Sequence, residues 1–60
     1  MKVREILKLL VEDGWYLKNQ RGSHMFYIHP IKKGKITVPN HSGDLNIKTA
    51  DSILRQAGLK

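Results

Sequence analysis

The apolar residues at the start of the chain repeat with the period of a helix. Between Lys2 and Asp13 they recur at spacings of three and four residues, which gathers them on one helical face: Val3, Ile6, Leu7, Leu10 and Val11. Gly14 follows at the position where helices commonly end in a left-handed residue. We therefore predict a first helix over 2–13, with Leu9 at the margin of its apolar face or exposed.

Three extended segments follow this helix. Residues 15–20 are rich in extended-chain formers and end at the turn 21–23, and residues 24–29 form a second candidate strand. Residues 30–34 are its turn, and apolar and polar positions alternate over 35–39, which predicts a third strand. Because the connections are short, we expect the strands to form an antiparallel meander.

A second amphipathic helix is predicted near the end of the chain. Residues 40–45 form a loop, and Asn46 is a suitable N-cap for a helix over 47–57 that ends at Gly58 and Leu59 in a Schellman-like stop. Its apolar face is Ile47, Ala50, Ile53, Leu54 and Ala57. The order is α-β-β-β-α, which predicts a single α+β domain over 1–60. In it, a three-stranded antiparallel sheet is covered on one face by two helices.

Four aromatic residues fall on the first two predicted strands: Trp15, Tyr16, Phe26 and Tyr27. Aromatic side chains on a sheet can stack on nucleic-acid bases, but a domain this small also needs them in its core. Because strand residues alternate between faces, one member of each adjacent pair should point inward. We expect at least half of the four to be core residues.

The distribution of charge indicates a class of partner. Eleven Lys and Arg against five Asp and Glu give a net charge of +6, and the chain has no cysteine. Every fully charged side chain between residues 14 and 42 is positive, namely Lys18, Arg21, Lys32, Lys33 and Lys35. A field of one sign attracts phosphate, so nucleic acid or an acidic protein partner is favoured over a basic surface kept for solubility.

Other classes of protein are disfavoured by what the sequence lacks. No apolar run approaches the roughly 20 residues that span a bilayer, and no signal-peptide pattern opens the chain, so we expect a cytoplasmic protein. Without cysteine a thiolate zinc site is excluded. His24 and His29 are an odd number of residues apart and should point to opposite faces of a strand. We therefore expect no metal site and no cofactor.

The turn Arg21-Gly22-Ser23-His24 carries the residue types that metal-free RNA cleavage needs. Arg21 can hold a phosphate in a two-pronged fork, and Gly22 lets backbone approach a ligand closely. Ser23 adds a neutral donor, and a histidine such as His24 can exchange a proton at cellular pH. The alternative is an ordinary surface hairpin with an incidental histidine.

Taken in order along the chain, several short motifs resemble the HicA family of bacterial and archaeal toxins. They are an opening helix ending in Gly14-Trp15, then Gly22-Ser23-His24, Ile36-Thr37-Val38-Pro39-Asn40-His41 and Ile53-Leu54-Arg55-Gln56-Ala57-Gly58-Leu59. The resemblance covers nearly the whole chain. It implies a double-stranded-RNA-binding-domain-like fold and an mRNA interferase, a ribonuclease toxin whose catalytic histidine falls on His24. It also implies a HicB-type antitoxin that covers His24 and the basic surface.

The leading hypothesis is therefore a metal-independent endoribonuclease toxin, with no DNA contact expected of the toxin alone. Its predicted RNA contacts are Lys18, Arg21, Gly22, Ser23, Lys32, Lys33, Lys35 and His41, of which Ser23 and His41 are candidates to assist His24. Two alternatives stay open. One is a non-catalytic RNA-binding module with the same fold, and the other is an adaptor whose basic face serves an acidic partner protein.

Overall fold

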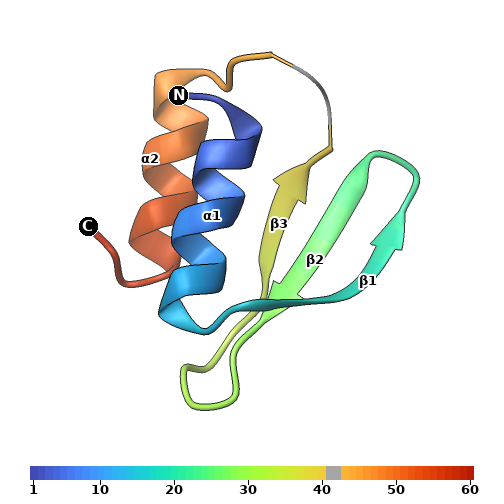
Figure 1. Cartoon of the computed structure of the whole chain (residues 1–60), viewed down its shortest axis with the longest axis vertical. Helices are drawn as coiled ribbons and strands as arrows, with labels where there is room; N and C mark the ends of the chain where they lie inside the picture. Colours follow the sequence, from blue (N-terminus) through green and yellow to red (C-terminus); the bar gives the residue numbers. More distant parts are fainter. Residues whose placement is uncertain (41–42) are drawn as a thin grey trace.

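The fold is built from two helices and a three-stranded sheet (Figure 1). The computed structural model describes residues 1–40 and 43–60. In order, the elements are α1 (Val3–Asp13), β1 (Tyr16–Arg21), β2 (His24–Ile28), β3 (Ile36–Pro39) and α2 (Ile47–Gln56). The strand order is β1-β2-β3 with both pairs antiparallel. The predicted α+β meander, with its double-stranded-RNA-binding-domain-like order, is confirmed.

Both helices end where the glycines predicted. Gly14 has φ +109°, and the Trp15 N–H donates to the Leu10 carbonyl at 2.9 Å. Gly58 has φ +74°, and the Leu59 N–H donates to the Leu54 carbonyl at 2.8 Å. Both are Schellman stops. Neither helix of the described chain is long and apolar enough to cross a membrane.

The N-terminus of α2 is capped as its sequence predicted. The Asn46 side-chain oxygen accepts a hydrogen bond from the Lys48 N–H at 2.8 Å. At the start of α1, which had no predicted cap, the Glu5 carboxylate instead accepts from the Lys2 N–H at 3.0 Å. Each contact satisfies a backbone donor that a helix or its first turn leaves open.

The helices cover β2 and β3, and leave β1 outside. Figure 1 shows α1 and α2 together on the β3 side of the molecule, with β1 farthest from them. All six residues of β1 are exposed, whereas β2 and β3 alternate between buried and accessible positions. The core residues are Val3, Ile6, Leu10, Trp15, Met25, Tyr27, Ile36, Val38, Leu45, Ala50, Ile53 and Ala57.

Two residues assigned to apolar faces are exposed. Val11 is 58% exposed and Ile47 is 80% exposed, so both predictions were wrong. Val11 lies about 100° around the helix from Leu10, beyond the edge of a buried face that is narrower than the sequence spacing suggested. Ile47 begins α2, one turn before the first buried residue of that helix, Ala50.

The expectation for the aromatic residues is confirmed. Trp15 and Tyr27 are core residues, Phe26 is half-buried and Tyr16 is exposed. Burial raises the pKa of the Tyr27 phenol, which therefore stays neutral in the core. The loop that precedes α2 also contributes a core residue, because Leu45 is buried and its N–H donates to the Met1 carbonyl at 2.8 Å.

Candidate functional site

The face of the sheet that points away from the helices carries the candidate site. In β2, Met25 and Tyr27 are buried under the helices, so the alternate residues His24, Phe26 and Ile28 lie on the other face. Directly paired residues of antiparallel strands share a face. This open face therefore consists of three rows: Arg21, His24 and Pro39; Asn19, Phe26 and Thr37; Tyr16 and Ile28.

The first row brings His24 and Arg21 together at the β1–β2 turn. The turn has two residues, Gly22 with φ +56° and Ser23, and no described non-glycine residue has a positive φ. Glycine with positive φ at the first turn position is typical of a type II′ hairpin. The register of that hairpin sets Arg21 directly opposite His24, and both side chains are exposed.

On its other side, His24 and the hairpin turn are tied to the end of β3. His24 pairs with Pro39, and the Asn40 N–H donates to the Ser23 carbonyl at 2.6 Å. The hairpin turn is thereby fixed to the end of β3, which gives the exposed histidine a rigid base. His41, predicted to contact RNA or to assist His24, lies outside the described residues.

The second row adds two further predicted cations. Between Leu17 and Asn19 the register of β1 slips by one residue, so that Lys18 lies in a β-bulge beside Phe26. The Lys35 ammonium lies 4.9 Å from the centroid of the Phe26 ring, in a cation–π contact. Lys18 and Lys35 therefore both belong to the neighbourhood of the open face.

The open face carries positive charge without compensating acids. None of the three strands contains Asp or Glu, and all five acids lie on the helices or just before α2: Glu5, Glu12, Asp13, Asp44 and Asp51. Asp51 is paired with Lys60 and, at 2.9 Å, with Arg55, and the hydrogen bond from Lys60 lowers the pKa of that carboxyl group. The segregation of charge seen in the sequence thus becomes a segregation between the two sides of the fold.

Lys32 is not brought to His24. Its ammonium donates to the Asp13 carboxylate at 2.6 Å and to the Ala57 carbonyl at 2.7 Å, which joins the C-terminal ends of the two helices. A cation at helix C-termini is stabilising. Lys32 and its neighbour Lys33 follow the far end of β2, which spans about 13 Å from His24. Their predicted contact with RNA at the same site as His24 stays a prediction.

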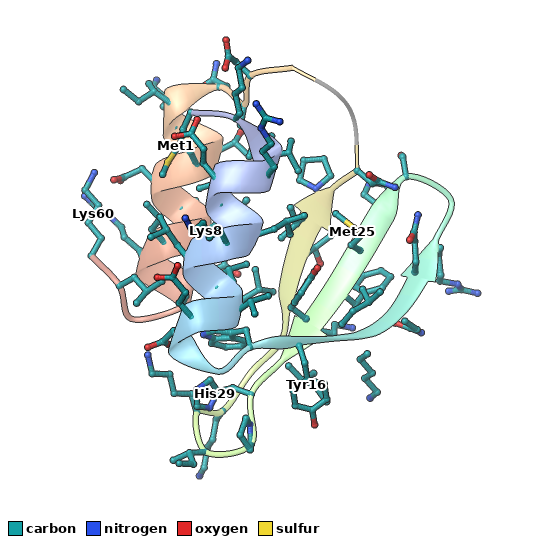
Figure 2. The ribbon with its side chains drawn as sticks, in the orientation of Figure 1. Met1, Lys8, Tyr16, Met25, His29 and Lys60 are labelled. Atoms are coloured by element: carbon teal, nitrogen blue, oxygen red, sulfur yellow. The ribbon has the colours of Figure 1, made fainter. Side chains whose placement is uncertain are left out.

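His29 has a structural place, as Figure 2 shows beneath the end of α1. Its Nδ1 accepts the N–H groups of Ile31 and Lys32 at 3.0 Å each. Because Nδ1 accepts, Nε2 carries the proton and donates it to the Asp13 carbonyl at 2.8 Å. The ring also meets Trp15 edge-on, with the centroids 5.2 Å apart.

The three-way contact of Asp13, His29 and Lys32 was missed from the sequence, where these residues are 16 and 19 positions from Asp13. Among residues 1–40 and 43–60, no group of three or more His, Asp or Glu side chains is placed to hold a metal ion.

We expect Lys32→Met to lower the melting temperature, and Lys33→Met, the same change at an exposed neighbour, to leave it nearly unchanged. The hydrogen bond from Lys32 holds the pKa of the Asp13 carboxyl below its ordinary value. A depressed acid pKa stabilises the fold above the unfolded pKa, and this stabilisation is lost as the pH falls from about 5 toward 2. In thermal melts over that range, the melting temperature of Lys32→Met should therefore fall less steeply with decreasing pH than that of the wild type. Parallel curves for the two variants would contradict the assignment.

Comparison with known proteins supports the resemblance. A family model described as "HicA toxin of bacterial toxin-antitoxin" matches residues 3–59. Among solved structures, the chain is similar to one from a "Toxin-Antitoxin complex from Streptococcus pneumoniae", with 35% identity and a TM-score of 0.81. That match covers 98% of this chain and 98% of the other. No curated protein matches the chain significantly.

Proposed function

The chain belongs to the HicA family of toxins of bacterial toxin–antitoxin systems, and we propose that it acts as a metal-independent endoribonuclease that cleaves mRNA with His24 as its catalytic residue. The observation that carries the proposal is the first row of the open face. An exposed histidine stands directly across from an exposed arginine, at a rigid hairpin on a face without acids. This combination offers a proton acceptor beside a phosphate-binding fork.

The proposed reaction uses the RNA's own 2′-hydroxyl as nucleophile. His24 takes the hydroxyl proton as the 2′ oxygen attacks the adjacent phosphorus, and the bond from phosphorus to the 5′ oxygen breaks. The leaving 5′ oxygen acquires a proton from His24 or water, so that the products are a 2′,3′-cyclic phosphate and a 5′-hydroxyl. Arg21 stabilises the charge that accumulates on the phosphate oxygens. We assign Ser23, in the same turn, as a further hydrogen-bond donor to these oxygens.

We further propose that a HicB-type antitoxin neutralises the toxin by covering His24 and the open face. The similar chain from Streptococcus pneumoniae comes from a toxin–antitoxin complex. A net charge of +6 with an acid-free sheet favours an inhibitor whose contact surface is acidic, since complementary charge speeds and orients association.

The decisive assay is incubation of the purified protein with a long mRNA in EDTA. We expect cleavage, with products ending in 2′,3′-cyclic phosphate, and no cleavage of an oligonucleotide that is 2′-deoxy throughout. Protein that is folded, free of antitoxin and bound to RNA, yet leaves it intact, would instead support the non-catalytic RNA-binding module. Cleavage that EDTA abolishes would contradict metal independence.

Arg21→Ala is expected to lower the cleavage rate by about tenfold or more, because a donor aimed at developing phosphate charge is lost. Arg21→Lys should recover part of the rate, since a lysine keeps the charge but not the fork. The matched control is Lys8→Ala on α1, which removes the same charge away from the open face (Figure 2). Equal losses in Arg21→Ala and Lys8→Ala would mean that net charge, and not position, sets the rate.

A further inference from the structure

The second row of the open face contains an aromatic residue that the core does not require. Phe26 is half-buried on the side of the sheet that the helices leave bare. Its paired neighbours are Asn19 in β1 and Thr37 in β3, both polar. The helix-side residues Met25 and Tyr27 already fill the core beneath it. Phe26 therefore presents part of a large ring on an uncovered sheet face, between two polar side chains.

The side chain of Lys35 already lies over the Phe26 ring. The Lys35 ammonium lies 4.9 Å from the ring centroid, so the Phe26 ring offers a π surface to a charged group that comes from the turn before β3. Nucleic-acid bases use the same kind of surface, and a nearby cation favours their phosphates. Phe26 and Lys35 thus combine the two kinds of contact by which proteins hold single-stranded nucleic acid, namely base stacking and attraction of phosphate.

The spacing links this pair to the proposed cleavage site. Phe26 follows His24 by two residues on one strand, and both lie on the open face, so their Cα atoms are about 7 Å apart. That separation is of the order of one nucleotide step along an extended RNA strand. If a phosphate is held between Arg21 and His24, a neighbouring base is therefore within reach of Phe26.

We propose that Phe26 is a stacking platform for an unpaired base next to the scissile phosphate, and that Lys35 moves from the ring toward the RNA backbone when the base arrives. This rests on the proposed function and names its substrate class as single-stranded RNA. In an A-form duplex the bases are stacked on one another and cannot lie on the ring. The fold resembles a domain that binds duplex RNA, whereas the residues of the open face favour single-stranded RNA. We therefore base the substrate class on the open face and not on the fold.

The experiment measures binding of an uncleavable, single-stranded 2′-O-methyl RNA to the wild type, Phe26→Leu and Phe26→Tyr. Loss of one stacked base is expected to weaken binding by Phe26→Leu about 5- to 150-fold. Phe26→Tyr keeps a ring and should bind like the wild type. Lys35→Met should reduce the slope of log affinity against log salt by about 0.7, whereas Phe26→Leu should leave the slope unchanged.

Two readouts need only the wild type and protect the test against a variant that fails to fold. In a set of RNAs with 2-aminopurine at successive positions, binding should quench the fluorescence of one position more than that of its neighbours. The same RNA annealed to its complement should bind more weakly than the single strand.

The inference is overturned if the duplex binds as tightly as the single strand and Phe26→Leu binds both like the wild type. Wild-type cleavage of mRNA in EDTA would then still support the proposed function. A wild type that neither binds nor cuts any RNA would overturn both.

Discussion

His24→Ala is expected to lower the rate of RNA cleavage by about 10²- to 10⁴-fold, the typical contribution of one proton-transfer residue. His24 is exposed on the open face and belongs to none of the core contacts, so the variant should keep its fold and melting temperature. RNA affinity should change little, because the phosphate contacts that we propose come from Arg21 and the neighbouring lysines. Single-turnover rates with RNA in EDTA, together with thermal melts, measure both quantities.

The matched control for this variant is His29→Ala. His29 donates to the Asp13 carbonyl at the end of α1 and accepts the N–H groups of Ile31 and Lys32, so we expect its loss to lower stability while the remaining folded protein still cleaves RNA. The two substitutions should therefore have distinct effects, His24→Ala on the cleavage rate and His29→Ala on stability. A His24→Ala protein that cleaves at the wild-type rate would remove His24 from the mechanism.

The contrast between these histidines shows what the sequence could supply. Strand alternation places residues an odd number apart on opposite faces, and this rule separated His24 from His29 correctly. The partners of His29 were out of reach, because contacts between the end of α1 and the β2–β3 turn depend on how the elements pack. For the same reason Lys32 looked like one more member of a basic cluster, although its ammonium is held by Asp13 and Ala57.

The open face was only partly predictable. The hairpin turn followed from a short-range signal, namely a glycine between two extended segments. Arg21 was predicted to lie in that turn, whereas it is the last residue of β1 and pairs with His24. The exposure of β1 could not be predicted from the sequence, since a strand with polar and aromatic residues can be covered or bare depending on where the helices cross the sheet. The bulge at Lys18 and the contact of Lys35 with Phe26 likewise arise from register and packing, which periodicity does not specify.

Gly14→Ala is expected to destabilise the fold strongly, because two costs coincide at this position. A non-glycine residue at φ +109° carries a backbone cost of about 1–3 kcal/mol. An added Cβ would also lie 2.8 Å from His29 Nε2, the atom that donates to the Asp13 carbonyl. Displacing that ring leaves hydrogen bonds unmade, at about 1 kcal/mol each.

Gly34→Ala provides the matched control for this variant. Gly34 has a similar φ of +97°, but its added Cβ would meet nothing within 4 Å. Both variants therefore carry the backbone cost, and only Gly14→Ala disturbs the histidine. A domain of this size has a total stability on the order of 3–9 kcal/mol, so Gly14→Ala should leave a substantial unfolded population in urea titrations where Gly34→Ala stays folded.

A double variant separates the two costs at Gly14. In a His29→Ala background the ring is absent, and the further loss caused by Gly14→Ala should fall to that of Gly34→Ala. If Gly14→Ala costs the same with and without His29, the close approach to the ring does not limit residue 14, and the positive φ alone accounts for the glycine. If the coupling is present, the end of α1 and the β2–β3 turn fold as one unit. The C-terminal end of α2 also belongs to this unit, because Lys32 hydrogen-bonds both Asp13 and Ala57.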